Sequence, residues 1–227
     1  MKKHFSTCPA CKAAYFVTLL AFPSLSSATI NLSLNGGYGY WDTGIEDNAR
    51  GRILGGNLAY YNHRYYTGLR YQRGKFTESK SHAIINRKQA EWIIGYQLGP
   101  STSLFGGLKL IEIDYQATQE QANLVFDERI TGVGVGFNTH QSLNSLWQSY
   151  ATIALNGLVT RFNEVNNRVN GQGINLSAST GLIYLLHKQL QINTGLNFQT
   201  FTIQYNDNKS NGNNSLLMLN TSLIYQF

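Results

Sequence analysis

Charged residues are scarce in this 227-residue chain: Asp, Glu, Lys and Arg make up 13% of it, whereas 42% is hydrophobic. Proline occurs 3 times and cysteine twice. Intrinsic disorder is excluded by the 14 Tyr and 11 Phe, which are too many for a chain that stays unfolded. Beyond the first residues, no run of roughly 18 apolar residues offers a membrane-spanning helix. These absences leave one folded domain that crosses no membrane as a helix.

Residues 1–28 have the features of an export signal. The chain begins with a pair of lysines, continues with a short apolar core at residues 13–22 and reaches a small-residue cleavage site at Ser26–Ala28. Because an apolar stretch of this length is too short to span a bilayer, we expect the signal to be removed. The mature chain then begins near Thr29.

Both cysteines, Cys8 and Cys11, lie inside this segment, so their spacing does not predict a redox or metal site in the mature protein. Loss of the three lysines of the segment lowers the formal net charge from +6 to +3. A charge this small is not typical of a protein that binds nucleic acid. The rest of the chain shows no metal-ligand spacing and no glycine-rich phosphate loop. We therefore expect no metal, cofactor or nucleic acid.

Residues 29–227 repeat an alternation of apolar and polar side chains that is typical of transmembrane β-strands. In the first repeat, Leu32 and Leu34 share one face and Ser33 lies on the other. A soluble β-sandwich also alternates, but here one face of nearly every repeat is Asn, Gln, Ser, Thr or Gly, which suits a lumen. The expected strands lie near 30–41, 53–61, 65–71, 90–98, 104–110, 130–137, 147–159, 174–184, 190–199 and 217–227.

The connections between these strands alternate in length. We expect long ones near 42–52, 74–88, 116–128, 160–172 and 206–214, and short ones near 62–64, 99–102, 138–145 and 186–189. Outer-membrane barrels have long extracellular loops and short periplasmic turns. The sequence therefore predicts an all-β fold, a transmembrane antiparallel up-and-down β-barrel of ten strands with both termini in the periplasm. Eight or twelve strands stay open as alternatives.

The carboxyl end carries a further signal. Leu223, Tyr225 and Phe227 alternate on one face up to the final residue. With this ending, the chain resembles the small bacterial outer-membrane β-barrel superfamily, which includes opacity-like and solitary autotransporter-like barrels. The resemblance implies residence in a Gram-negative outer membrane, contact with the lipid bilayer, and insertion by the outer-membrane assembly machinery. It implies no particular extracellular ligand.

Three charged residues are expected to meet inside the barrel. Counted from the short turns, Arg70, Glu91 and Lys109 point inward at a similar height on neighbouring strands. A carboxylate between two cations satisfies buried charge in a narrow lumen, so we favour a salt-bridged plug over a functional gate.

The sequence offers little support for an enzyme. His63, His140 and His187 are expected in periplasmic turns, where they cannot serve an extracellular hydrolytic site. Outer-membrane proteases of the omptin type pair acids at the rim, and Glu128 and Asp207 match no such motif. His140 and Ser142 have the spacing of a His-x-Ser pair of lipid A deacylases, but within an expected turn.

Basic residues of the expected loops are well placed to meet the phosphates of lipopolysaccharide. They are Arg50, Arg52, Lys75, Lys80, Arg87, Lys88, Arg161, Arg168 and Lys209. The leading hypothesis is a non-enzymatic surface or structural barrel with a largely plugged lumen, which contacts ligands through long extracellular loops. The first alternative is a small pore for small solutes, and a hydrolase acting on protein or lipid A is the second.

Overall fold

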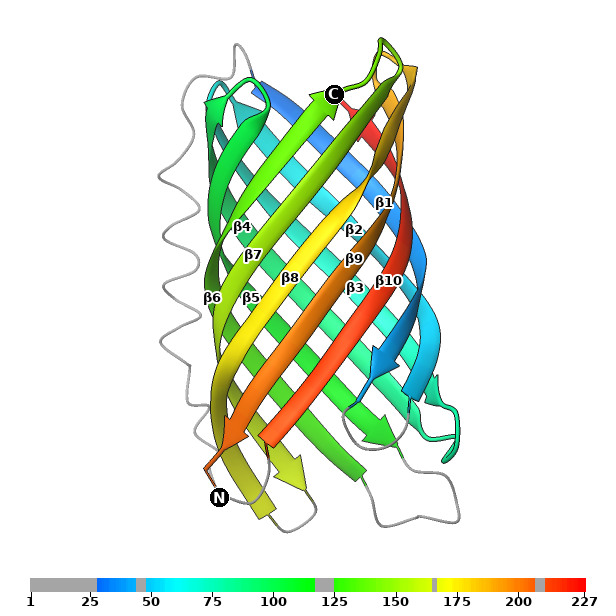
Figure 1. The fold of residues 1–227 in the computed structure, drawn as a ribbon, viewed down its shortest axis with the longest axis vertical. Helices are drawn as coiled ribbons and strands as arrows, with labels where there is room; N and C mark the ends of the chain where they lie inside the picture. Colours follow the sequence, from blue (N-terminus) through cyan, green and yellow to red (C-terminus); the bar gives the residue numbers. More distant parts are fainter. Residues whose placement is uncertain (1–27, 44–47, 117–124, 165–166, 207–210) are drawn as a thin grey trace, which may run out of the picture.

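The computed structural model describes residues 28–43, 48–116, 125–164, 167–206 and 211–227. All of the expected signal except Ala28 lies outside these residues. The described part consists of ten strands (Figure 1): β1 (Ala28–Asp42), β2 (Asn48–Asn62), β3 (Tyr65–Glu78), β4 (Ile84–Gly99), β5 (Thr102–Gln116), β6 (Val125–Ser142), β7 (Trp147–Glu164), β8 (Asn167–His187), β9 (Leu190–Tyr205) and β10 (Asn211–Gln226).

Each strand pairs antiparallel with the next, and β10 pairs with β1 to close the barrel. Leu34 of β1 lies between Gly56 of β2 and Leu223 of β10, so no strand edge is left open. The fold class and the strand number predicted from the alternation are confirmed. Among the described residues, no helix is long and apolar enough to cross a bilayer.

The two ends of the barrel differ. Residues 63–64, 100–101, 143–146 and 188–189 connect strands at one end, which we call the short-turn end. Phe227 ends the chain there, where its backbone N–H donates to the carbonyl of Ile30 at 2.9 Å. The C-terminus accordingly lies at the upper end of the barrel in Figure 1. The opposite end is called the far end.

An apolar belt surrounds the half of the barrel next to the short-turn end. Leu34, Leu54 and Val135 are 68%, 69% and 63% exposed on its outer surface. A continuous apolar surface of this extent is unfavourable in water, whereas the hydrocarbon core of a bilayer favours it. Aromatic side chains gather at the short-turn rim of the belt, where Trp147 and Tyr184 lie 4.7 Å apart between ring centroids.

The expected long loops are mostly strand, and this part of the prediction was wrong. Strand β3 continues to Glu78 and β4 starts at Ile84, although a loop was expected over 74–88. Between β7 and β8 only residues 165–166 lie outside the strands. The strands are 14 to 21 residues long, beyond the roughly 9–11 residues that cross a bilayer. The barrel therefore extends past the membrane.

The cause of the error is an inversion of polarity along the strands. On β5, the inward residue Lys109 is followed inward by Ile111 and Ile113, while the outward residue Leu110 is followed outward by Glu112. Toward the far end the outer wall is thus charged and the interior apolar. Buried apolar residues of this half form one cluster, the apolar core: Trp41, Ala49, Ile53, Phe76, Ile85, Ile111, Ile113, Ile130, Leu158, Phe201, Ile203, Leu216 and Met218.

A second correction concerns the turn expected at 138–145. Strand β6 runs on to Ser142, and β7 begins at Trp147. His140 is consequently a strand residue, paired with Tyr150 of β7. The turn itself is confined to residues 143–146, and of the polar run that suggested a longer one, Asn138 and His140 point into the lumen from β6.

Candidate functional site

Polar side chains cross the lumen at mid-height, between the apolar core and the short-turn end. They come from β3, β4, β5, β7, β8 and β9, and most of them are buried. We call this set the polar layer: Arg70, Arg87, Gln89, Glu91, Lys109, Asn156, Asn175 and Gln199.

The carboxylate of Glu91 is the centre of this layer. Its strand neighbours in the register are Arg70 on β3 and Lys109 on β5. The ammonium of Lys109 lies 3.0 Å from Oε1, and the guanidinium of Arg70 lies 3.4 Å from Oε2. The amide of Gln89 also donates to Oε1 at 2.7 Å. The structure thus brings the three residues of the expected lumen cluster together.

Other bonds of the polar layer span the interior between strands that are not neighbours. Lys109 of β5 donates to Oδ1 of Asn175 on β8 at 3.0 Å, and the same oxygen also accepts from Asn156 of the adjacent strand β7 at 3.1 Å. Arg87 of β4 donates to Oε1 of Gln199 on β9 at 3.1 Å. Arg87 was expected in an exposed loop and is buried instead. Arg87 lies an even number of residues before Glu91 on β4, and alternate residues of a strand share a face, so the sequence did carry a signal that Arg87 points inward.

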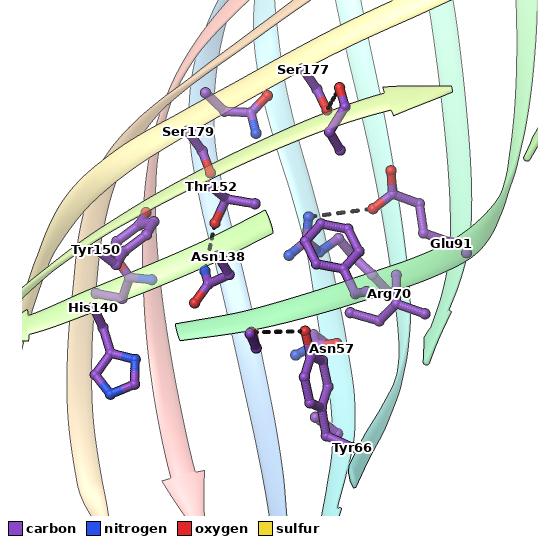
Figure 2. A pocket seen from close by; sticks show the side chains of 18 of the residues that line it. Asn57, Tyr66, Arg70, Glu91, Asn138, His140, Tyr150, Thr152, Ser177 and Ser179 are labelled. Atoms are coloured by element: carbon purple, nitrogen blue, oxygen red, sulfur yellow. Dashed lines mark hydrogen bonds and ion pairs between the residues drawn. The ribbon is translucent and has the colours of Figure 1, made fainter. Parts of the chain in front are cut away.

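Between the polar layer and the short-turn end, the lumen holds a cavity of about 560 Å³ that we call the vestibule. Tyr66 and Tyr150 form part of its wall (Figure 2). Tyr66 lies over Gly95, where an added Cβ would come within 2.1 Å of the ring, so the glycine makes room for the aromatic wall. Figure 2 also shows the Asn138 amide donating to Thr152 at 2.6 Å.

On the other side of the polar layer, toward the far end, the interior is filled by the apolar core. Trp41 and Phe76 pack edge to face with ring centroids 5.3 Å apart. At its far-end margin the carboxylate of Glu128 accepts hydrogen bonds from Thr160 at 2.6 Å and from Tyr205 at 2.8 Å. Burial raises the pKa of Glu128 above its ordinary value, and the two hydrogen bonds oppose the rise.

The candidate catalytic residues do not converge. His140 lines the vestibule, whereas Glu128 is inside the far half, on the other side of the polar layer. Within the described ranges no group of three or more His, Cys, Asp or Glu is arranged to hold a metal ion. Asp207 lies outside the described residues.

The expected basic loop residues lie mostly on the outer wall of strands. Arg52 of β2 is directly opposite Lys75 of β3, and Arg73 of β3 is directly opposite Lys88 of β4. These four residues, just beyond the apolar belt, form what we call the basic wall. Lys209 lies outside the described residues. At the other end of the barrel, the expected insertion signal faces outward as exposed apolar residues: Leu223, Tyr225 and Phe227.

No protein-family model matches the chain, and no curated protein matches its sequence. Solved structures do match its fold. The outer-membrane protease OmpT from Escherichia coli aligns with a TM-score of 0.59 at 9% identity, over 89% of this chain and 97% of that one. The β domain of the Bordetella autotransporter BrkA aligns with a TM-score of 0.53 at 10% identity, over 88% and 100%. The translocator domain of the autotransporter NalP from Neisseria meningitidis gives 0.50 at 10%, over 95% and 94%.

This chain has the fold of the small outer-membrane β-barrels. The closed barrel and its apolar belt agree with residence in a Gram-negative outer membrane. In outer-membrane barrels of known orientation the short turns face the periplasm. With that orientation the vestibule would open toward the periplasm, and the far half, with its charged wall and apolar core, would stand on the extracellular side.

The ion pairs of the polar layer predict a large cost for the substitution Glu91→Gln. It leaves the buried ammonium of Lys109 without a carboxylate, and breaking a buried ion pair costs about 3–5 kcal/mol. We expect the free energy of unfolding in urea, measured in detergent micelles, to fall by about 3 kcal/mol. This is the lower end of the range, because water that enters the vestibule can partly solvate the unpaired ammonium.

The matched control is Glu112→Gln on the outer wall. This carboxylate is 45% exposed and meets Lys88 at 3.8 Å and Arg129 at 3.6 Å, so its loss is expected to cost no more than about 1 kcal/mol. Equal costs at the two positions would contradict the layer as described.

The raised pKa of Glu128 predicts that the barrel loses stability as the pH rises. The folded state binds the proton more tightly than the unfolded state, so the stabilisation is complete below the unfolded-state pKa and is lost as the pH passes the folded-state pKa. Glu128→Gln removes this dependence and keeps an oxygen for Thr160 and Tyr205. We expect unfolding free energies of the variant to exceed those of the parent only at the higher pH values. Parallel pH curves would show that Glu128 is not the cause.

Proposed function

We propose that this protein is a non-conducting surface barrel that contacts the phosphates of lipopolysaccharide through its basic wall. The observation that carries the proposal is the apolar core, which fills the extracellular half of the lumen. With the interior occupied there, the outer wall is the surface left for contact with the cell exterior. The connections at the far end are too short to serve as that contact surface, because most residues of the expected loops belong to strands.

The charges of the basic wall support this choice. Like charges directly opposite each other on neighbouring strands repel, yet Arg52 faces Lys75 and Arg73 faces Lys88. Lys88 is 3.8 Å from both Glu112 and Asp114. The ion pairs found in the described ranges include none with Arg52, Arg73 or Lys75. An anion from outside the chain relieves the repulsion, and phosphate is the anion at the outer surface of this membrane.

The height of the basic wall fits a lipid phosphate. Leu54, the outward residue next after Arg52 on β2, is still part of the apolar belt. Tyr71 precedes Arg73 in the same way on β3. The cations therefore begin where the apolar surface ends, which is the level of the lipid headgroups.

Export by residues 1–28 and assembly through the C-terminal strand belong to the same proposal. The exposed outward face of Leu223, Tyr225 and Phe227 supports a role in insertion, because an assembly factor has direct access to it before the strand meets lipid. OmpT is a protease, but a likeness at 9% identity carries no activity to this chain, and we propose no catalytic role.

A small pore is the second candidate, because the vestibule brings water halfway through the barrel. Conduction through such a pore requires the side chains of both the polar layer and the apolar core to move apart at the same time. We rank it below the closed barrel, since the core packs with side chains that are nearly all inaccessible to solvent.

The basic wall predicts tight, phosphate-dependent binding of lipopolysaccharide. Vesicles of phosphatidylcholine with and without lipopolysaccharide are mixed with the refolded barrel, and the shift of its unfolding midpoint is measured. Arg73→Gln with Lys75→Gln removes two charge-assisted bonds, each worth about 1.5–3 kcal/mol, so at least about tenfold weaker binding is expected.

The control removes two arginines elsewhere on the outer wall, Arg161→Gln with Arg168→Gln, for the same change in net charge. It is expected to bind nearly as the parent does. Equal loss of lipopolysaccharide binding in both double variants would show that binding depends on net charge and not on the basic wall. No loss of binding in either would overturn the proposal.

A further inference from the structure

We propose that the vestibule is a binding site for a small periplasmic molecule that carries a carboxylate or phosphate group, with Arg70 as the residue that binds the anion. The inference is independent of the basic wall, because the apolar core and the polar layer separate the two. It rests on the charge, the geometry and the lining of the cavity.

The charges around the vestibule do not balance. Its lining includes the cations Arg64, Arg70 and Lys109 and, within the described part of the chain, a single carboxylate, that of Glu91. Arg87 adds another buried cation behind the floor. A plug that served only to satisfy its own charges would need more carboxylates than this. The excess positive charge at the end of a narrow cavity with low-dielectric walls attracts anions.

The geometry of the floor leaves Arg70 available. Glu91 is engaged mainly by Lys109 at 3.0 Å and by Gln89 at 2.7 Å, whereas Arg70 reaches it through one long contact of 3.4 Å. The side chain of Arg70 is 44% exposed, against 6% for that of Lys109. A guanidinium carries five N–H donors in a planar fork that matches carboxylate and phosphate, and the contact of Arg70 with Glu91 engages one nitrogen, Nη1.

The walls suit the body of a small polar ligand. Tyr61 and Tyr66 stack with ring centroids 5.5 Å apart and, like Tyr150 on the other side, line the cavity. Asn57 and Asn138 add amides, and Figure 2 shows Arg70 in the same space as these groups. A volume of about 560 Å³ falls within the roughly 300–1,000 Å³ of small-molecule sites. Aromatic faces with a few polar groups and one exposed cation are typical of such sites.

The test uses the refolded full-length barrel in uncharged detergent with two probes, inorganic phosphate and acetate, and with glucose as the neutral control. Binding is read as a saturable rise of the urea unfolding midpoint with probe concentration. We expect at least one of the anions to stabilise the parent and glucose not to. Arg70→Gln is expected to weaken that binding at least about tenfold, and Arg70→Lys to weaken it less.

Arg161→Gln is the matched control, because Arg161 is an exposed arginine on β7 that belongs neither to the vestibule nor to the basic wall. It should bind the anions as the parent does. Equal binding by the parent and by Arg70→Gln, or loss in Arg161→Gln, would overturn the site.

A second measurement needs no substitution, should Arg70→Gln fail to fold. The parent is labelled with phenylglyoxal, an arginine reagent, and each arginine is quantified by mass spectrometry with and without phosphate. Protection of Arg70 but not of Arg161 supports the site, and equal labelling of Arg70 in both conditions rejects it. Phosphate and acetate compared side by side distinguish a phosphate ligand from a carboxylate ligand.

Discussion

Closure of the barrel by the pairing of β10 with β1 is the constraint on which the rest of the structure depends. It satisfies both edges of the sheet and fixes which side chains point inward. At the level of the polar layer, side chains fill most of the interior that the ten strands enclose, so the buried charges there need partners within that space. The bonds from Lys109 to Asn175 and from Arg87 to Gln199 cross the lumen for this reason.

One half of the barrel faces lipid and the other half faces water. Along each strand the same alternate positions keep pointing inward, but the apolar side chains change from the outward to the inward positions. Next to lipid, Leu108 and Leu110 face out and Lys109 faces in. One step further along β5, Glu112 faces the water outside and Ile111 packs inside. The far half is thus built like a soluble protein, with an apolar core and a charged surface. The polar layer lies at the level where the lipid ends.

The fold was predictable because the alternation of apolar and polar residues is a strong signal when it repeats many times. The strand number, the antiparallel order and the meeting of Arg70, Glu91 and Lys109 follow from counting residues outward from the short turns. The same counting rule places Arg87, which was nevertheless read as a loop residue.

The far half was misread because the expectation of apolar outward faces holds only within lipid. Outside it, charged residues such as Arg52 and Lys75 were taken as signs of loops, although they alternate with Ile53 and Phe76 of the core. The partners of the charged cluster across the lumen, Asn175 and Gln199, depend on strand tilt and register. No local pattern in the sequence carries that information.

The lumen has a cavity toward its short-turn end and an apolar core in its far half, which keeps the cavity apart from the proposed outer contact surface. The most direct test is single-channel recording from the refolded barrel in planar bilayers, with folding verified by heat-modifiable migration and insertion by co-sedimentation with vesicles. A lumen closed by the apolar core predicts an inserted, folded barrel that gives no discrete conductance steps. Steps from the unaltered protein, especially steps whose size changes in Glu91→Gln, would contradict it and make the protein a pore.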